Sequence, residues 1–387
     1  MAKKLRVGIL FGGRSGEHEV SLLSAASILK AIDRRKFEVV PIGITKAGRW
    51  LTSDRAQALL TGASDESPNA ASGSSPAPAT AVTALIPDAA AIEEASQSSG
   101  AGKLDCVFPV LHGTFGEDGT IQGLFELADI AYVGSGVLGS AAGMDKDAMK
   151  RLFAQARLPI VRHVTVLRTA WEASPRKTVT AIEAALKYPV FVKPANLGSS
   201  VGISKVHDRK ELGPALNLAS RFDRKIVIEE GVAGTGKARG TTKARELEVA
   251  VLGNDDPKAS VVGEIVPAKE FYDYEAKYLS DASIPIIPAK LTPAETKQIR
   301  AMAVAAFQAC DLAGLARVDF LMEPDGKRRI YLNEVNTLPG FTSISMYPKL
   351  WQASGLSYSD LITRLIELAM ERHQERSRTT FNFDVPR

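Results

Sequence analysis

Long apolar runs and cysteines are both scarce in this chain of 387 residues. No apolar run approaches the roughly 20 residues that a membrane-spanning helix needs, so we expect no binding to or insertion into a membrane. The two cysteines, Cys106 and Cys310, lie in apolar segments without a pairing pattern, which indicates reduced core thiols in a reducing compartment. Lys3 and Lys4 precede a short apolar run, but no cleavage-like segment follows, so we predict a cytoplasmic protein.

A strong excess of one charge is lacking as well. The net charge of +4 is small for this length and gives no indication of a nucleic-acid partner. The composition, with 45% hydrophobic and 24% charged residues, is typical of a soluble globular protein. Because one hydrophobic core seldom grows to this size, we expect two or three domains.

Two common nucleotide-binding signatures are also missing. No segment has the Walker A spacing, which excludes a P-loop NTPase. The glycines between residues 8 and 16 do not have the Gly-x-Gly-x-x-Gly spacing, and the strand-like segment that ends at Thr45 lacks the acidic residue that binds a ribose. A nicotinamide-dependent oxidoreductase is therefore only an alternative, which a nicotinamide-binding assay would test.

Short apolar segments alternate with helical patterns in the first third of the chain. We predict strands at 5–11, 37–44, 104–110 and 131–133, and helices at 19–32 and 120–128. This alternation is typical of an α/β fold with a doubly wound parallel sheet. Residues 63–102 interrupt it with an Ala/Ser/Pro-rich composition that is nearly free of aromatics, which predicts a mobile insertion.

Two further units follow. The second begins with a helix after Asp145, whose apolar stripe includes Met149 and Ala156, and continues with strands at 188–194 and 225–229. The third has strands at 246–253 and 260–266, a loop at 269–290, a helix at 293–311, a hairpin and a closing helix near 358–372. The glycine-rich, basic segment 234–243 predicts a solvated loop. We place the domains at 1–144, 145–233 and 234–387.

The hairpin between residues 313 and 336 has polar residues grouped at one end. Pro324-Asp325-Gly326 is a strong turn signal between two segments rich in β-branched and aromatic residues. If the strands pair antiparallel with residue numbers that sum to 653, Arg317 faces Asn336 and Asp319 faces Glu334. We expect these four side chains to share one face.

On the same face, this register would also place Leu321, Ile330 and Leu332. Two carboxylates and a carboxamide beside an apolar surface are suitable ligands for Mg²⁺ that keeps waters and phosphate oxygens in its other positions. A solvated sheet face would give the same pattern, because antiparallel sheets often expose one side. The metal site nevertheless points to an enzyme that acts on nucleotide phosphates.

Two lysines add to this interpretation. Lys193 ends a strand, and the small-residue loop 195–203 that follows can bring backbone N–H groups close to phosphate oxygens, although an ordinary glycine turn would have the same composition. Lys146 lies in the first turn of a helix, where the helix dipole disfavours a cation unless an anion is near, although an exposed lysine there costs little.

These residues belong to a series of motifs that resembles the D-alanine–D-alanine ligases of the ATP-grasp superfamily. The motifs cover nearly the whole chain apart from the two insertions, and their order makes the resemblance specific. They are Gly12-Gly13-Arg14-Ser15-Gly16-Glu17-His18-Glu19-Val20-Ser21, Leu111-His112-Gly113, Gly116-Glu117-Asp118-Gly119, Met144-Asp145-Lys146, Val192-Lys193-Pro194, Gly198-Ser199-Ser200-Val201-Gly202, Phe271-Tyr272-Asp273-Tyr274-Glu275-Ala276-Lys277-Tyr278, Arg317-Val318-Asp319 and Asn333-Glu334-Val335-Asn336-Thr337-x-Pro339-Gly340.

The resemblance implies an ATP-grasp fold, α+β in its ATP-binding part, behind an N-terminal doubly wound parallel-sheet domain. ATP would be a substrate, bound between the central and C-terminal domains with Mg²⁺ or Mn²⁺, as two ions. One D-alanine carboxylate would attack the γ-phosphate, and the amine of a second D-alanine would displace phosphate to form D-alanyl-D-alanine for peptidoglycan. The partners implied are D-alanine, ATP and a second copy of the chain in a homodimer.

The resemblance also implies the residues that bind ATP and metal. Those at ATP would be Lys146, Lys193, Ser199, Ser200, Lys277, Asn333 and Glu334, with Glu246 at the ribose and Glu229, Glu230 and Val232 at the adenine. Those at the metal ions would be Asp319, Glu334 and Asn336. Many relatives have a lysine where this chain has Glu230, a difference without consequence if only the backbone carbonyl contacts the adenine.

The remaining roles concern the amino acids that are joined. Glu17 would bind the first ammonium and link to Ser199 and Tyr278, with His112 nearby. Arg317 and the Gly340 N–H would stabilise the tetrahedral intermediate, and Ser345 would meet the second carboxylate. Lys277 and Tyr278 would belong to a loop that closes over the reaction and excludes water. A D-alanyl-D-lactate ligase, in which this tyrosine is replaced, is the nearest alternative.

Overall fold

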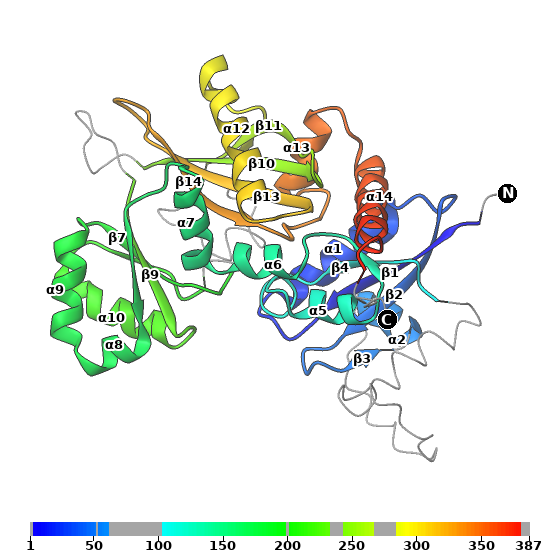
Figure 1. The fold of residues 1–387 in the computed structure, drawn as a ribbon, viewed down its shortest axis with the longest axis horizontal. Coiled ribbons are helices and arrows are strands. Elements are labelled where there is room, and N and C mark those ends of the chain that lie inside the picture. The colour runs from blue at the N-terminus through cyan, green and yellow to red at the C-terminus, as the bar shows by residue number, and fades with distance from the viewer. Residues whose placement is uncertain are drawn as a thin grey trace, which may run out of the picture.

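The computed structural model describes residues 3–51, 53–61, 103–198, 201–232, 243–266 and 284–380. Within these ranges the chain forms three β-sheets, which lie in separate parts of the molecule (Figure 1). Among the described helices, none is both long and apolar enough to cross a membrane. The predicted insertions at 63–102 and 234–243 lie almost wholly outside the described residues.

The first sheet has the strand order β3-β2-β1-β4-β5. Strands β1, β2, β4 and β5 are parallel, and the short β3 is antiparallel to β2, so the predicted doubly wound sheet is confirmed. Most of β1 and β4 is buried, as expected for parallel strands that are covered on both faces. The elements are β1 (Leu5–Gly12), α1 (His18–Ala31), β2 (Phe37–Ile44), β3 (Trp50–Leu51), α2 (Ser53–Leu60), β4 (Cys106–Val110), α5 (Thr120–Leu127), β5 (Ala131–Tyr132) and α6 (Val137–Met144).

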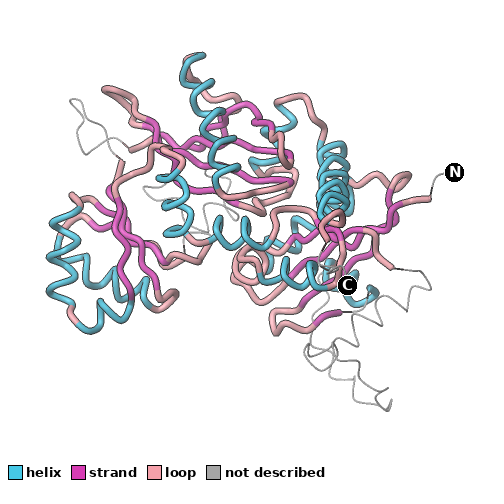
Figure 2. The backbone as a smooth tube through the Cα atoms, viewed as in Figure 1, coloured by secondary structure: helices cyan, strands magenta, loops and turns pink. Residues whose placement is uncertain are grey.

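The second sheet is antiparallel, with the order β6-β9-β7-β8. Figure 2 shows α8, α9 and α10 gathered on its outer side, where they pack over a separate small core. The two strands predicted here are confirmed, and β6 and β8 were not anticipated. The elements are α7 (Lys146–Gln155), β6 (His163–Leu167), α8 (Arg168–Ala173), α9 (Pro175–Ala185), β7 (Val190–Pro194), β8 (Ser204–Val206), α10 (Arg209–Ser220) and β9 (Lys225–Glu230).

The third sheet is also antiparallel, with the order β12-β11-β10-β13-β14. Helices α12 and α7 cover one face and bury its apolar side chains. The predicted loop at 269–290 is wrong in its described part, because residues 284–286 form the edge strand β12. The elements are β10 (Arg245–Gly253), β11 (Lys258–Val266), β12 (Ile284–Ile286), α12 (Pro293–Ala309), β13 (Gly314–Met322), β14 (Ile330–Asn336), α13 (Met346–Ala353) and α14 (Tyr358–Arg376).

Helix α14 joins the first and third units. It begins at a side-chain cap, in which the Ser357 hydroxyl accepts the Asp360 N–H, and then packs along β4 and β5 of the first sheet (Figure 1). Leu361, Ile362 and Leu365 share one continuous core with residues of β1 and β4. The C-terminal helix therefore fixes the N-terminal sheet relative to the unit that contains the hairpin.

The segment 64–100 gives a first testable prediction. Its composition offers little apolar surface to bury, and long surface insertions add little loop-closure entropy. A Gly/Ser linker of about ten residues spans up to about 30 Å, enough to pass from α2 to β4 across one intervening strand. We expect this replacement to leave the melting temperature and the enzymatic activity that the resemblance implies nearly unchanged. A clear drop in either quantity would mean that the segment packs on the core.

Candidate active site

Strands β13 and β14 form the predicted hairpin, with a register that changes part-way along. Arg317 pairs with Asn336 and Asp319 with Glu334, as predicted, but Phe320 then pairs with Leu332, because Asn333 is an extra residue in a β-bulge. Past the bulge the side chains of β14 exchange faces.

The predicted face is therefore correct at its polar end and wrong at its apolar end. Ile330 and Leu332 lie in the core under α12 and α7, on the face opposite the polar group. Leu321 stays on the polar side and pairs with Tyr331. Since a bulge cannot be recognised from alternation alone, the register beyond Glu334 could not be read from the sequence.

The polar ends of three adjacent strands meet on this face. Arg317 donates two hydrogen bonds of 2.7 Å to the Asp319 carboxylate, and its Nε lies 3.2 Å from Oε2 of Glu248 on β10. The Asn336 amide donates to Asp319 over 3.0 Å. Glu248 pairs with Asp319 across β10 and β13, so a further carboxylate that was not predicted lies in this polar group.

The donor set of this face is suited to a magnesium ion that shares its coordination with a ligand. Asp319, Glu334 and Asn336 offer two carboxylates and a carboxamide from paired positions of the hairpin. The Oδ1 atom of Asn333 is buried and has no hydrogen-bond partner among the described residues. Within the same residues, no group of three His, Cys, Asp or Glu side chains could hold a metal alone. Such a set fits Mg²⁺ whose other ligands come from water and phosphate.

Lys146 lies at a helix N-terminus, which is unfavourable for a cation, but its ammonium group reaches a carboxylate and a carbonyl oxygen. The Asp145 side chain caps α7 by accepting from the N–H groups of Asp147 and Ala148. The Lys146 Nζ donates to the Leu197 carbonyl over 2.9 Å, and it lies 3.9 Å from Oε2 of Glu334. This lysine thus connects the loop after β7 with the polar face of the hairpin.

Lys193 lies at the end of β7 beside buried carboxylates. Its Nζ donates to Oε2 of Glu229 over 2.8 Å. Burial alone would lower the pKa of Lys193, but the charges of Glu229, Glu334 and Glu246 outweigh it and raise the pKa. Lys193 is therefore a permanent cation between strand β9 and the carboxylates of the third sheet.

Glu17 connects the first unit with the loop after β7. A Cβ built on Gly113, whose φ is +79°, would lie 2.6 Å from Oε2 of Glu17, and one on Gly198 would lie 3.2 Å from it. Glycine at 113 is required both by this positive φ and by the close approach of the carboxylate. Since Ser199 follows Gly198, Glu17 and the predicted phosphate loop are neighbours.

His112 holds a backbone segment of the third unit. Its Nδ1 bonds the Leu338 carbonyl over 2.9 Å, and its Nε2 bonds the Ser24 hydroxyl over 3.0 Å. The same hydroxyl accepts the Phe341 N–H over 3.3 Å. Both ring nitrogens are occupied, so the imidazole binds Leu338 directly and Phe341 through the Ser24 hydroxyl, at the two ends of the segment 338–341 that contains Gly340.

Glu117 completes this attachment from the other side of the same peptide. Its carboxyl accepts the Gly113 N–H over 2.8 Å and the Leu338 N–H over 3.4 Å. Burial raises the pKa of Glu117 to about 8, with a further contribution from the neighbouring charge of Glu17.

The environment of His112 gives a prediction about stability. Burial lowers its pKa to about 4, from 6.5 for an accessible histidine. The unfolded chain therefore binds more protons between pH 6.5 and 4, so this contribution is complete above pH 6.5 and is lost as the pH falls through 4. At pH 5 we expect the loss to be about 2 kcal/mol of unfolding free energy. Urea unfolding of wild type and His112→Gln at pH 7.5 and 5 measures it: the difference between the two proteins should shift by that amount, and a pH-independent difference would contradict the prediction.

The remaining candidate residues differ in how they are placed. The Ser345 hydroxyl bonds the hydroxyl of Thr342 over 2.8 Å and lies one turn after Gly340. The Glu230 carboxylate accepts the Lys187 N–H over 2.8 Å and lies 3.6 Å from Arg162, so it points away from Lys193. Val232 is half-buried just after β9. Ser199, Ser200, Lys277 and Tyr278 lie outside the described residues.

Two family models match this chain and together cover most of it. The family model described as "D-ala D-ala ligase N-terminus" matches residues 6–135, and "D-ala D-ala ligase C-terminus" matches residues 152–367. The D-alanine–D-alanine ligase of Bacillus cytotoxicus is 48% identical over 98% of this chain and 99% of its own length. The chain belongs to the D-alanine–D-alanine ligase family.

Other members of the family agree in sequence and in structure. The D-alanine–D-alanine ligase of Geobacillus thermodenitrificans is 50% identical over 98% of this chain and all of its own length. The VanG D-Ala:D-Ser ligase of Enterococcus faecalis is 35% identical with a TM-score of 0.75, covering 95% of this chain and 100% of that chain. The D-alanine–D-alanine ligase of Coxiella burnetii is 34% identical with a TM-score of 0.74, covering 97% of both chains. The chain is therefore an enzyme of the ligase class with the ATP-grasp fold, and an oxidoreductase is excluded.

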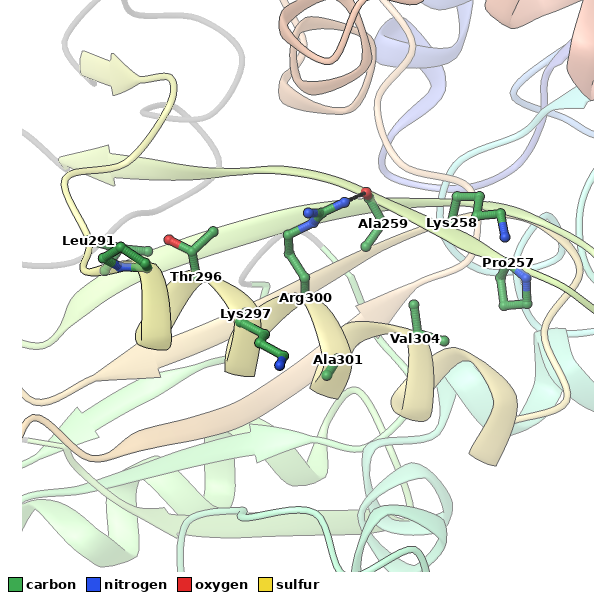
Figure 3. A pocket seen from close by; sticks show the side chains of 10 residues that line it. Pro257, Lys258, Ala259, Leu291, Thr296, Lys297, Arg300, Ala301 and Val304 are labelled. Carbon is green, nitrogen blue, oxygen red and sulfur yellow. Dashed lines mark hydrogen bonds between the residues drawn. The ribbon is translucent and has the colours of Figure 1, made fainter.

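One surface groove lies apart from this ligase site. It has a volume of about 660 Å³ and lies along the outer side of α12, where Arg300 donates to the Ala259 carbonyl over 2.8 Å (Figure 3). Helix α12 covers the apolar face of the third sheet, so the groove and the polar face of the hairpin lie on opposite sides. None of the candidate site residues lines it.

Three side chains of the ligase site were missed in the sequence. They are Lys150, Glu117 and Glu248. Lys150 contacts Glu229 and Glu248 contacts Arg317, two residues that were identified, and Glu117 accepts the Leu338 N–H. Lys150 lies one turn after Lys146, so the spacing of two lysines on one helix face was a usable signal. Glu117 lies within a quoted motif, but nothing local indicates that it meets Leu338.

Proposed function

We propose that this ligase joins two D-alanines into D-alanyl-D-alanine at the expense of ATP, for the synthesis of peptidoglycan precursors. The observation that supports it best is that Lys146 lies 3.9 Å from Glu334, whose charge also raises the pKa of Lys193, because two cations of the central unit then act with the carboxylate that would bind the metal. A Mg²⁺–triphosphate needs both kinds of group within reach. The full-length similarity to D-alanine–D-alanine ligases supports the choice of amino acid.

The reaction proceeds in two steps. A carboxylate oxygen of the first D-alanine attacks the γ-phosphorus of ATP, which forms D-alanyl phosphate and releases ADP. The neutral amine of the second D-alanine then attacks the acyl carbon, and the tetrahedral intermediate collapses to the peptide and inorganic phosphate. Because the acyl phosphate is hydrolysed by water, the site must be closed during both steps.

The chain's residues divide these tasks according to their positions. Glu17 binds the first ammonium, and Arg317 with the Gly340 N–H stabilises the oxyanion of the intermediate. Ser345 binds the second carboxylate, and Ser199 and Tyr278 orient the attacking amine. Lys146, Lys193, Ser200, Lys277 and Asn333 bind the phosphates, and Glu246 binds the ribose.

Asp319, Glu334 and Asn336 would hold Mg²⁺ or Mn²⁺, as two ions. When bound, the metal neutralises phosphate charge and orients the γ-phosphate. Arg317 donates two hydrogen bonds to the Asp319 carboxylate, so this carboxylate is already oriented within the polar face.

The role of His112 follows from its two occupied nitrogens. We assign it the task of holding the 338–341 segment, together with Glu117, so that the Gly340 N–H is fixed.

At the adenine, the Glu230 backbone carbonyl and the Val232 N–H are suitable partners, and the Glu230 side chain is engaged elsewhere. The three sheets support the domains 1–144, 145–233 and 234–387. The family resemblance supports a cytoplasmic homodimer.

An assay of products tests the function. The purified chain is incubated with ATP, Mg²⁺ and D-alanine alone, or with added D-lactate or D-serine, across pH 6–10, and ADP and the products are measured by mass spectrometry. We expect D-alanyl-D-alanine to be the main product with D-alanine alone and with either competitor. Predominant D-alanyl-D-serine or D-alanyl-D-lactate would replace the assignment, and the absence of ADP release with D-alanine would refute it.

A further inference from the structure

Three charged side chains, Lys150, Lys193 and Glu229, form a buried group that includes the lysine proposed to bind phosphate. Lys150 on α7 lies 2.9 Å from Oε1 of Glu229, and Lys193 on β7 lies 2.8 Å from Oε2 of the same carboxylate. The side chains of Lys150 and Glu229 are 1% and 3% exposed. Glu229 is thus shared between two ammonium groups, one on each oxygen.

Lys150 also contacts the hairpin. Its Nζ donates to the Asn333 carbonyl over 3.4 Å, at the bulge that precedes Glu334. Lys146 and Lys150 are four residues apart on α7, so they lie on the same side of the helix. Both therefore face the junction of the central and C-terminal units, and only Lys146 was expected to act there.

The charges of this group are strongly coupled. Burial alone would raise the pKa of Glu229, but the ammonium groups of Lys150 and Lys193 hold it well below its usual range. An ionised carboxylate in such a place is stable only with its cations. If Lys193 were its one partner, the two would form a neutral pair, and little positive field would remain for a phosphate.

We propose that Lys150 is a positioning residue for nucleotide binding. It pairs with one oxygen of the Glu229 carboxylate and neutralises its charge, so that the charge of Lys193 stays available to the ATP phosphates. The inference rests on the proposed ATP-dependent function and adds a residue to it. Three lysines, Lys146, Lys150 and Lys193, then balance the three glutamates Glu229, Glu246 and Glu334. Without Lys150 the group has an excess negative charge that opposes a triphosphate.

The test separates the charge of Lys150 from its packing. Lys150→Gln keeps a hydrogen-bond donor for the Asn333 carbonyl but removes the charge, and Lys150→Arg keeps the charge. Lys225→Gln is the matched control, because Lys225 on β9 is also mostly buried and pairs with Asp145 and Asp147 at the start of α7. Dissociation constants are measured for ATP with Mg²⁺ and for adenosine, the latter from its competition with ATP, and circular dichroism checks the fold.

We expect Lys150→Gln to raise the dissociation constant of ATP at least about tenfold, as the loss of a unit charge a few ångströms away predicts. The dissociation constant of adenosine should change by no more than about twofold. The KM for ATP should rise in proportion while kcat changes little, and Lys150→Arg should restore most of the affinity. Equal weakening of ATP and adenosine, or equal weakening of ATP by Lys150→Gln and Lys225→Gln, would overturn the proposal. If Lys150→Gln does not fold, a wild-type ATP affinity in Lys150→Met overturns it, and a selective tenfold loss in that variant supports it.

These results are independent of the identity of the product. A wild-type protein that binds ATP but forms no D-alanyl-D-alanine would refute the proposed function and leave the binding comparison valid. A protein that forms the dipeptide and keeps its ATP affinity in Lys150→Gln would refute only the role of Lys150.

Discussion

Replacement of Glu334 by glutamine should lower turnover by about a hundredfold or more while the fold stays intact. The carboxylate lies on the polar face beside Asp319 and 3.9 Å from Lys146, so it links the proposed metal site with a lysine that we propose binds phosphate. Glutamine keeps the shape but loses the charge that a hard cation requires, and even partners one shell further from a metal are worth about 10–100-fold. The measurement is kcat and KM for ATP over a range of Mg²⁺ concentrations, with a thermal melt.

The matched control for Glu334→Gln is Asp325→Asn, the same change of charge at the turn of the same hairpin. We expect Asp325→Asn to have nearly wild-type turnover, because the turn lies beyond the opposite end of both strands. If Glu334→Gln keeps wild-type turnover at limiting Mg²⁺, the hairpin is not the metal site. A loss of the folded state in the melt would instead assign Glu334 to stability.

Replacement of Tyr278 by phenylalanine should change which product the enzyme makes. The second D-alanine must react as a free amine, yet an amine is mostly protonated near neutral pH. A phenol linked to Glu17 and Ser199, as the family resemblance implies, would orient this amine and help it lose its proton, and general acid–base assistance of this kind contributes about 10²–10⁴-fold. The position of Glu17 next to Gly198 places it beside the start of that link. D-Lactate has no ammonium to deprotonate, so it does not need this assistance.

We therefore expect Tyr278→Phe to lower D-alanyl-D-alanine formation at least about tenfold and to raise the proportion of D-alanyl-D-lactate when both substrates are present. Tyr274→Phe removes a hydroxyl from the same motif and should leave the ratio unchanged. The two products are measured side by side at neutral and alkaline pH. An unchanged ratio, with both products reduced together, would show that Tyr278 only closes the loop.

Local patterns in the sequence were sufficient for the parallel sheet, the hairpin and the group of polar residues at its end. Apolar segments of the first unit are nearly continuous because both faces of the sheet are covered, and Pro324-Asp325-Gly326 fixes the turn. Asp319 and Glu334 then come together through pairing between neighbouring strands. Each of these features depends on residues close in the sequence, where propensity and alternation are informative.

The specificity for the second amino acid and the boundaries of the three domains stay predictions. Sequence order gives the family, and relatives named as D-Ala:D-Ala and D-Ala:D-Ser ligases share the fold with this chain. The choice between them depends on a few side chains around the second substrate, and Tyr278 lies outside the described residues. A product assay decides it more directly than the fold.

The amino-acid sequence by itself determined the parallel strands of the first sheet, the order of the motifs and the polar end of the hairpin, because these depend on local patterns along the chain. Only the tertiary structure decided that Asn333 forms a bulge, that Lys150 shares Glu229 with Lys193, and that His112 holds the Leu338 carbonyl across 226 residues of chain. Such pairs are selected by how helices and sheets pack. A buried charge or imidazole must be paired, and its partner is the polar group that tertiary packing places next to it. Local sequence patterns therefore do not predict that partner.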